Sequence, residues 1–137
     1  MDKILMNKMI KLAKLAQKHS YSPYSKYPVG ASVVGLSGKI YTGTNIENAS
    51  FGLSICAERV AIFKAISSGE KGIRDVCVVA RSVSPCGACR QVIIEFAQKD
   101  SKIIFVDWQS SKHSEKITVV DVNKLLYKPF KPEKAGL

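Results

Sequence analysis

The sequence predicts an α/β fold in which helices cover both faces of an open, five-stranded mixed sheet. The chain has 137 residues, close to the commonest size of one domain, and its 46% hydrophobic and 23% charged residues are typical of globular proteins. Helical and strand patterns alternate along the chain, which favours parallel pairing wherever a helix makes the crossover between strands. We therefore expect one domain over residues 1–137, built as a three-layer α-β-α sandwich, with a polar tail from about residue 127.

The first third of the chain predicts a helix, a loop and a hairpin. Over residues 2–18, apolar side chains recur at helical spacing: Leu5, Met9, Leu12, Ala13 and Ala16. Most lysines lie opposite, so we expect this helix to pack on a core, while a membrane-surface role stays open. A loop rich in Ser, Tyr and Pro covers residues 20–28. Residues 29–36 and 39–45 then predict two strands that pair around Ser37-Gly38.

The remainder alternates between helices and strands. After an irregular stretch over 45–54, we expect a helix over 56–67, a strand over 74–82, a helix over 86–98, and strands over 103–107 and 115–120. Gly69 and Gly72 end the first of these helices, and Ser84-Pro85 precedes the second.

The formal net charge of +10 raises the hypothesis of a nucleic-acid or acidic-membrane partner. The lysines are scattered, however, and no Arg-rich run occurs. We interpret them as solvated surface charges and expect neither a nucleic-acid nor a membrane partner. No apolar run approaches the ~20 residues of a membrane span, and lysines interrupt every N-terminal apolar stretch, so we expect a cytoplasmic protein.

Four cysteines without a secretory signal are expected to be metal ligands or catalytic thiols. Cys86 and Cys89 form a C-x-x-C pair, which alone is a weak signal because redox dithiols and structural zinc sites share it. Cys56, at the start of the other central helix, supplies a third thiolate. Three thiolates leave one tetrahedral position open, which is the pattern of a catalytic zinc site. Cys77 alternates with hydrophobic neighbours in a strand, so we expect it in the core.

Three charged residues flank these thiols. Glu58 lies two residues after Cys56, where we expect it to act as general acid and base beside the metal. Three thiolates around Zn²⁺ leave a net negative charge, which weakens the metal as a Lewis acid. Arg59 and Arg90 each follow a motif residue directly, and we expect them to donate hydrogen bonds to thiolate sulfurs.

Together these residues form a recognisable signature. Cys56-Ala57-Glu58 and Pro85 to Cys89 resemble the C-x-E and P-C-x-x-C pair of zinc nucleobase deaminases, with Cys in place of His as the first ligand. Four segments are similar to the small, homotetrameric type of cytidine deaminase: Tyr21 to Ser25, Pro28 to Ala31, Asn45 to Ser50 and Ser84 to Gln91. The resemblance runs to about Phe130. It implies zinc-dependent hydrolytic deamination of free cytidine and deoxycytidine to uridine and deoxyuridine, with release of ammonia, in pyrimidine salvage.

The resemblance also implies the residues that bind the substrate. In that family, the residues matching Asn45 and Glu47 bind the ribose hydroxyls. Tyr27 stands at a position that usually holds Phe and packs against the nucleoside. The resemblance assigns the backbone N–H of Ala57 to the base carbonyl, and the backbone carbonyl of Ser84 to the exocyclic amine.

The family is a homotetramer with one Zn²⁺ per subunit and with active sites at subunit interfaces. Phe51 matches a position that is commonly Tyr, and Phe130 matches a C-terminal aromatic residue that reaches a neighbour's pocket. Tyr127 stands where the family often has Pro, which leaves the path of the tail open.

Three alternatives remain. A related enzyme could deaminate another aminopyrimidine or a nucleoside-like antibiotic. A structural-zinc module could bind RNA, provided that Cys77 supplies a fourth ligand. A polynucleotide deaminase needs an open groove for a displaced strand.

Overall fold

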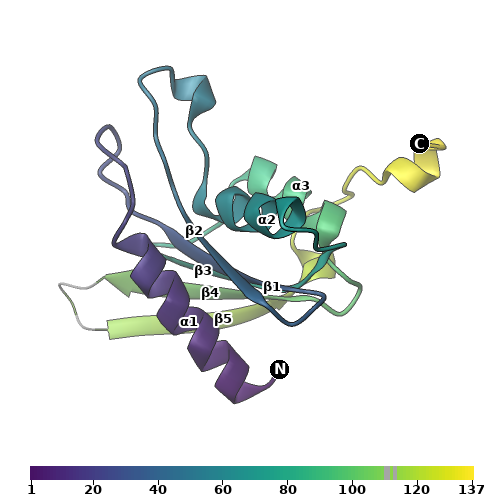
Figure 1. Cartoon of the computed structure of the whole chain (residues 1–137), viewed down its shortest axis with the longest axis horizontal. Helices are drawn as coiled ribbons and strands as arrows, with labels where there is room; N and C mark the ends of the chain where they lie inside the picture. The colour runs from purple at the N-terminus through teal and green to yellow at the C-terminus, as the bar shows by residue number, and fades with distance from the viewer. Residues whose placement is uncertain (110–111, 113) are drawn as a thin grey trace.

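In the computed structural model, which describes residues 1–109, 112 and 114–137, five strands form one mixed sheet with helices on both faces (Figure 1). The sheet order is β2-β1-β3-β4-β5, with β3 and β4 parallel and the other neighbours antiparallel. The main elements are α1 (Lys3–Gln17), β1 (Gly30–Gly35), β2 (Ile40–Thr44), α2 (Ala57–Ser67), β3 (Ile73–Ala80), α3 (Gly87–Phe96), β4 (Lys102–Gln109) and β5 (Ser114–Asp121). Helix α1 covers one face, and α2 and α3 cover the other. The predicted three-layer α/β fold is confirmed.

Two elements end earlier than their sequence pattern indicates. The strand expected over 74–82 ends at Ala80, because Ser82 takes a left-handed φ of 51° and its N–H donates to Asp107 Oδ1 at 3.0 Å. The helix expected over 86–98 ends at Phe96, because Ala97 is extended and forms a bridge with Ile73. Both differences result from contacts with strands that are more than 20 residues away along the chain.

Strand β3 is buried on both faces, as expected for a strand that pairs on both sides beneath helices. Its side chains alternate between two cores. Val76 and Val78 pack in the core that contains α2 and α3, whereas Cys77 and Val79 pack in the core beneath α1. The predicted burial of Cys77 is therefore confirmed, since its exposed fraction is 0%.

Glycine allows both helix layers to approach the sheet closely. A Cβ atom at Gly30 would lie 2.0 Å from the carbonyl oxygen of Ala13 in α1. A Cβ atom at Gly43 would lie 2.5 Å from the backbone nitrogen of Ala61 in α2. Contacts under 3.0 Å are sterically forbidden, so glycine at these two positions allows the short distance between the sheet and the helices α1 and α2.

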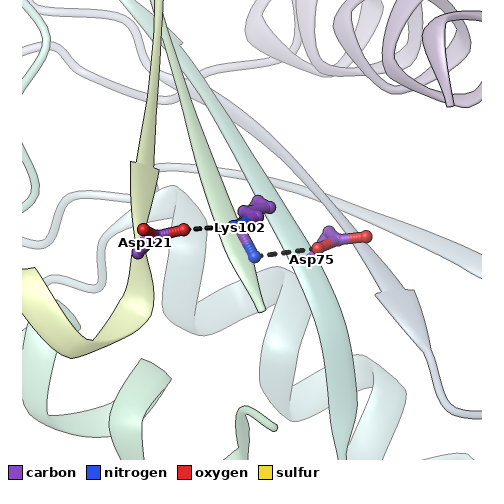
Figure 2. Close-up of polar contacts among 3 residues, drawn as sticks. All are labelled: Asp75, Lys102 and Asp121. Carbon is purple, nitrogen blue, oxygen red and sulfur yellow. Dashed lines mark hydrogen bonds and ion pairs between the residues drawn. The ribbon is translucent and has the colours of Figure 1, made fainter. Parts of the chain in front are cut away.

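Polar contacts of Lys102 join the three neighbouring strands β3, β4 and β5 at one end of β4 (Figure 2). The backbone N–H of Lys102 on β4 donates to Asp75 Oδ1 on β3 at 2.9 Å, and the Lys102 ammonium pairs with Asp121 on β5. Lys102, the first residue of β4, thereby links β4 to both neighbouring strands, β3 and β5. These contacts oppose a shift in the register of the strands.

After β5 the chain forms two short 3₁₀ helices, η3 (Val122–Lys124) and η4 (Pro132–Ala135). Leu125 is buried, whereas Tyr127 and Phe130 are 86% and 58% exposed on a tail that extends from the body (Figure 1). Among the described residues, no helix has the length and apolar character needed to cross a bilayer.

Candidate functional site

Three thiols meet where the two helices of one layer begin. Cys56 is the N-cap residue of α2, Cys86 is the N-cap residue of α3, and Cys89 lies in the first turn of α3. The Cys56 and Cys86 sulfurs are 3.8 Å apart, and those of Cys86 and Cys89 are 3.5 Å apart. Tetrahedral zinc with Zn–S bonds of ~2.3 Å separates its sulfurs by about 3.8 Å. The cluster therefore fits zinc, with one coordination position left for a non-protein ligand.

Cys77 does not belong to this cluster. It lies on the opposite face of the sheet, in the core beneath α1, and burial raises the pKa of its thiol to about 12. The metal-binding group found among the described residues contains Cys56, Cys86 and Cys89. A closed four-cysteine site, which the structural-zinc alternative requires, is therefore excluded by the placement of Cys77.

The local electrostatics favour thiolates. Both helix N-termini direct their unpaired N–H groups and positive dipole ends toward the sulfurs. The pKa of Cys56 is lowered, first because the Cys89 thiol donates to its sulfur and then because Arg59 does so. The Arg59 nitrogen Nη2 lies 3.5 Å from Cys56 Sγ, so the predicted arginine–thiolate contact is present for Arg59.

Arg90 differs from its prediction. Among the described residues, its guanidinium donates to the carbonyl oxygens of Pro85 and Leu125 and to Ser84 Oγ, rather than to a thiol. Arg90 therefore ties the loop before α3 to the segment that follows η3. Arg90 and Leu125 are 35 residues apart along the chain, so spacing within the motif does not reveal this contact.

Glu58 lies in the first turn of α2, beside the cluster and almost fully buried at 4% exposure. Burial raises the pKa of its carboxyl group, and the negative charge of Cys56 raises it further. A carboxyl group with a raised pKa exchanges protons more readily near neutral pH, which suits a general acid and base.

A pocket of about 450 Å³ opens in front of these groups. Its lining includes Cys56, Glu58 and Cys86 together with four predicted substrate-binding residues: Tyr27, Asn45, Glu47 and Ser84. Ala57 is fully buried at the first position of α2, where helix N–H groups lack intrahelical acceptors. The structure thus brings together residues that are up to 59 positions apart in the sequence, from Tyr27 to Cys86.

Asn45 also holds the pocket wall in place. Its Oδ1 accepts hydrogen bonds from Ser20 Oγ at 2.5 Å and from Val29 N at 3.0 Å, and its Nδ2 donates to the Tyr27 carbonyl oxygen at 2.8 Å. These bonds fix the loop of residues 20–28 against β2. Sequence analysis missed Ser20, for which the Ser-rich composition of the loop was the sole signal.

Glu47 stabilises the same loop from the other side. Its carboxylate accepts hydrogen bonds from the backbone N–H groups of Tyr24 and Ser25, at 3.0 and 3.1 Å, and from the Ser25 hydroxyl. The Ser25 hydroxyl is the main cause of a lowered pKa for Glu47. Sequence analysis did not identify Ser25 either.

Tyr27 completes the wall. Its hydroxyl donates to the carbonyl oxygen of Arg81, which supplies the partner that a half-buried phenol needs. Burial raises the pKa of this hydroxyl, so it remains a neutral donor.

Phe51 and Phe130 do not line the pocket formed by their own chain. Phe51 lies on the 3₁₀ helix η1 (Phe51–Leu53), is 71% exposed and contacts Tyr24 edge-on at 5.4 Å between ring centroids. Phe130 lies on the extended tail.

Comparison with known proteins agrees with this site. The family model described as the zinc-binding region of cytidine and deoxycytidylate deaminases matches residues 4–106. A cytidine deaminase of Halalkalibacterium halodurans is 42% identical over 128 residues, or 91% of this chain and 93% of that protein. One from Sporosarcina psychrophila is 50% identical over 94 residues, or 66% of this chain and 69% of that protein. The crystal structure of cytidine deaminase from Burkholderia pseudomallei has a TM-score of 0.83 and 36% identity, covering 95% of this chain and 100% of that one.

Proposed function

This chain belongs to the family of zinc-dependent cytidine and deoxycytidylate deaminases, and we propose that it hydrolyses free cytidine and deoxycytidine to uridine and deoxyuridine, releasing ammonia. The observation that carries the proposal is the open cluster of Cys56, Cys86 and Cys89 beside the buried carboxyl group of Glu58. The pocket of about 450 Å³ has the size of a small-molecule site.

Cys56, Cys86 and Cys89 would hold the zinc as thiolates. When bound, the metal lowers the pKa of a water molecule toward ~7 and so supplies a nucleophile at neutral pH. Arg59 offsets part of the negative charge of the three thiolates by donating to Cys56.

Glu58 moves the protons of the reaction. It takes a proton from the attacking water and delivers it to N3 of the base, which makes C4 electrophilic. After the water oxygen has added to C4, Glu58 takes the remaining proton from the new C4 hydroxyl and transfers it to the amino group, and ammonia leaves as the C4 carbonyl forms. Cytidine and water are thereby converted to uridine and ammonia, and Glu58 ends in its starting protonation state.

The pocket wall supplies the specificity. Asn45 and Glu47, two residues apart, would bind the ribose hydroxyls, and Tyr27 would pack against the nucleoside. The Ala57 N–H and the Ser84 carbonyl would recognise the carbonyl and the amino group of the base. Because Asn45 and Glu47 also hold the loop of residues 20–28, sugar recognition and pocket shape depend on the same two side chains.

The experiment is to incubate zinc-loaded protein with cytidine and follow ultraviolet absorbance as the amino group is lost. Glu58→Gln should retain one zinc per chain and lose at least about 10²–10⁴-fold in turnover. Glu95→Gln, the same change at an exposed position of α3, is the matched control and should keep normal turnover. Zinc-loaded protein that leaves cytidine unchanged but deaminates another aminopyrimidine would contradict the proposed substrate.

We further propose that the chain forms a homotetramer in the cytoplasm and acts in pyrimidine salvage. The exposed rings of Phe51 and Phe130 support shared active sites, since both lie outside the pocket of their own chain. Gel filtration with light scattering should give four chains per particle. Phe51→Ser and Phe130→Ser should raise the KM for cytidine, and a fully active monomer would contradict the shared site.

A further inference from the structure

A second cavity, larger than the catalytic pocket, lies on the opposite side of the sheet. It has a volume of about 760 Å³ and lies between α1 and the ends of β4 and β5. We call it the α1 groove. Among the described residues, it shares no lining residue with the catalytic pocket. Helix α1 packs mainly on β1, β2 and β3 and covers Ile104 and Val106 of β4, whereas Ile117 of β5 remains 40% exposed beside it.

The walls of the α1 groove are apolar and include the sole tryptophan of the chain. Trp108 is half-buried, and Leu15 and Ile117 remain 45% and 40% exposed beside it. The Lys14 ammonium lies 3.9 Å from the centroid of the Trp108 ring and pairs with Glu115. Lys14 therefore packs against the Trp108 ring, and its positive charge is neutralised by Glu115.

The remaining charges of the α1 groove are positive. Lys11, Lys18 and Arg81 line it, and none of them has a carboxylate within 4.0 Å among the described residues. The acidic residue of the lining, Glu115, is held by Lys14. An apolar slot with unneutralised cations at its rim is complementary to a flat apolar body that carries a negative group.

We propose that the α1 groove binds a small aromatic anion, in which the ring lies against Trp108 and Ile117 and a phosphate pairs with Lys11, Lys18 or Arg81. The α1 groove lies on the face of the sheet away from the zinc ligands, and its Arg81 also contacts Tyr27 of the catalytic pocket. Salt should weaken the binding, since these cations are exposed.

Trp108 supplies the measurement, because its fluorescence reports directly on the α1 groove. The zinc-loaded protein is titrated with phenyl phosphate, with inorganic phosphate as the anion alone and with phenol as the ring alone. Phenyl phosphate should change the fluorescence saturably, with a Kd between about 0.1 and several millimolar. Inorganic phosphate and phenol should each bind at least about threefold more weakly than phenyl phosphate.

A matched pair of double variants tests the role of charge. The double variant Lys11→Gln with Lys18→Gln should raise the Kd for phenyl phosphate by about threefold or more. Lys3→Gln with Lys8→Gln removes the same charge from exposed positions of the same helix outside the groove and should leave the Kd unchanged. Equal weakening in both variants, or no saturable change in Trp108 fluorescence, overturns the proposal. Fluorescence that depends on protein concentration instead of ligand indicates that a second copy covers the groove, which also overturns it.

Discussion

Arg59 and Arg90 occupy similar positions at the starts of α2 and α3, but the two residues have different roles. Arg59 donates to the sulfur of Cys56, so it adjusts the charge of the metal cluster. Arg90 donates to Pro85 and Leu125, so it holds the loop that carries Cys86. Replacing either residue should impair the enzyme. We expect the loss of Arg59 to lower turnover and the loss of Arg90 to lower thermal stability.

For Arg59→Gln, we expect zinc to remain bound while turnover falls by about 10–100-fold, the usual effect of removing a hydrogen bond to a metal ligand. For Arg90→Gln, we expect lower thermal stability because buried carbonyl groups lose a charged donor. Zinc content, kcat and the unfolding midpoint distinguish the two outcomes. Arg74→Gln, which changes an exposed side chain near the start of β3, is the control. Loss of zinc in Arg59→Gln would show that Arg59 determines binding rather than reactivity.

The three-cysteine cluster could be predicted from the sequence, and so could the position of Glu58 beside it, because the residues of each motif are close along the chain. The hydrogen bonds that hold the pocket wall in place could not be predicted from the sequence. Ser20 and Ser25 hold Asn45 and Glu47 through contacts between segments more than 20 residues apart. Neither residue type nor local spacing distinguishes these serines from others in the loop.

At the scale of elements, α2 is the critical helix, because it carries Cys56 at its N-cap and Glu58 in its first turn. Its position depends on close packing against β2 at Gly43. The alternating patterns predicted the three α-helices and five strands, since each pattern reflects which face is buried, but not the short 3₁₀ helices η1, η3 and η4. The ends of β3 and α3 escaped prediction because Asp107 and Ile73, on other strands, determine them.

Gly43→Ala should therefore displace the start of α2. The added Cβ would lie 2.5 Å from Ala61 N and 2.6 Å from Ala57 O, which are backbone atoms that cannot rotate away. We expect a loss of about 1–3 kcal/mol in the free energy of unfolding, together with reduced kcat. Urea denaturation and the cytidine assay measure the two effects. Gly52→Ala is the control, because a Cβ there meets no atom within 4 Å.

The hairpin of β1 and β2 is joined to the segment after α2 by Glu70. Its carboxylate accepts from the Ser37 hydroxyl and N–H and from the Tyr41 hydroxyl, and the Ser37 bonds are the main cause of its lowered pKa. A carboxyl group with a lower pKa in the folded state stabilises the fold above its unfolded pKa. That contribution is lost as the pH falls through the folded pKa.

We therefore expect the unfolding midpoint to decrease below about pH 4.5 partly through Glu70. Glu70→Gln should be less stable than the parent at neutral pH, and the difference should shrink as the pH is lowered. Thermal unfolding from pH 3 to 7 provides the comparison. A difference that is constant across this range would rule out ionisation of Glu70 as the cause.

At the scale of the whole molecule, the sheet separates two working surfaces. The face under α2 and α3 carries the three-cysteine cluster and the proposed catalytic pocket, and the face under α1 carries the α1 groove. The metal cluster also joins α2 to α3, so metal binding and folding should be linked.

Removing zinc with a chelator should abolish activity and lower the Tm by on the order of 10 °C, as expected when the folded state alone binds the metal at about 100 times its Kd. Readdition of zinc should restore both. Calorimetry of the holoprotein with and without chelator makes the measurement. Cys77→Ser should show the same chelator effect, since Cys77 lies on the other face; a variant without zinc would contradict the three-thiol site.

The position of the cluster along the chain has a consequence for biosynthesis. Cys56, Glu58, Cys86 and Cys89 all precede β4 and β5, whereas β3 pairs with β1, which is made earlier. The growing polypeptide therefore presents its complete ligand set before the last two strands are translated. Metal loading can begin on the nascent chain, and closure of the sheet by β4 and β5 then becomes the last step of maturation.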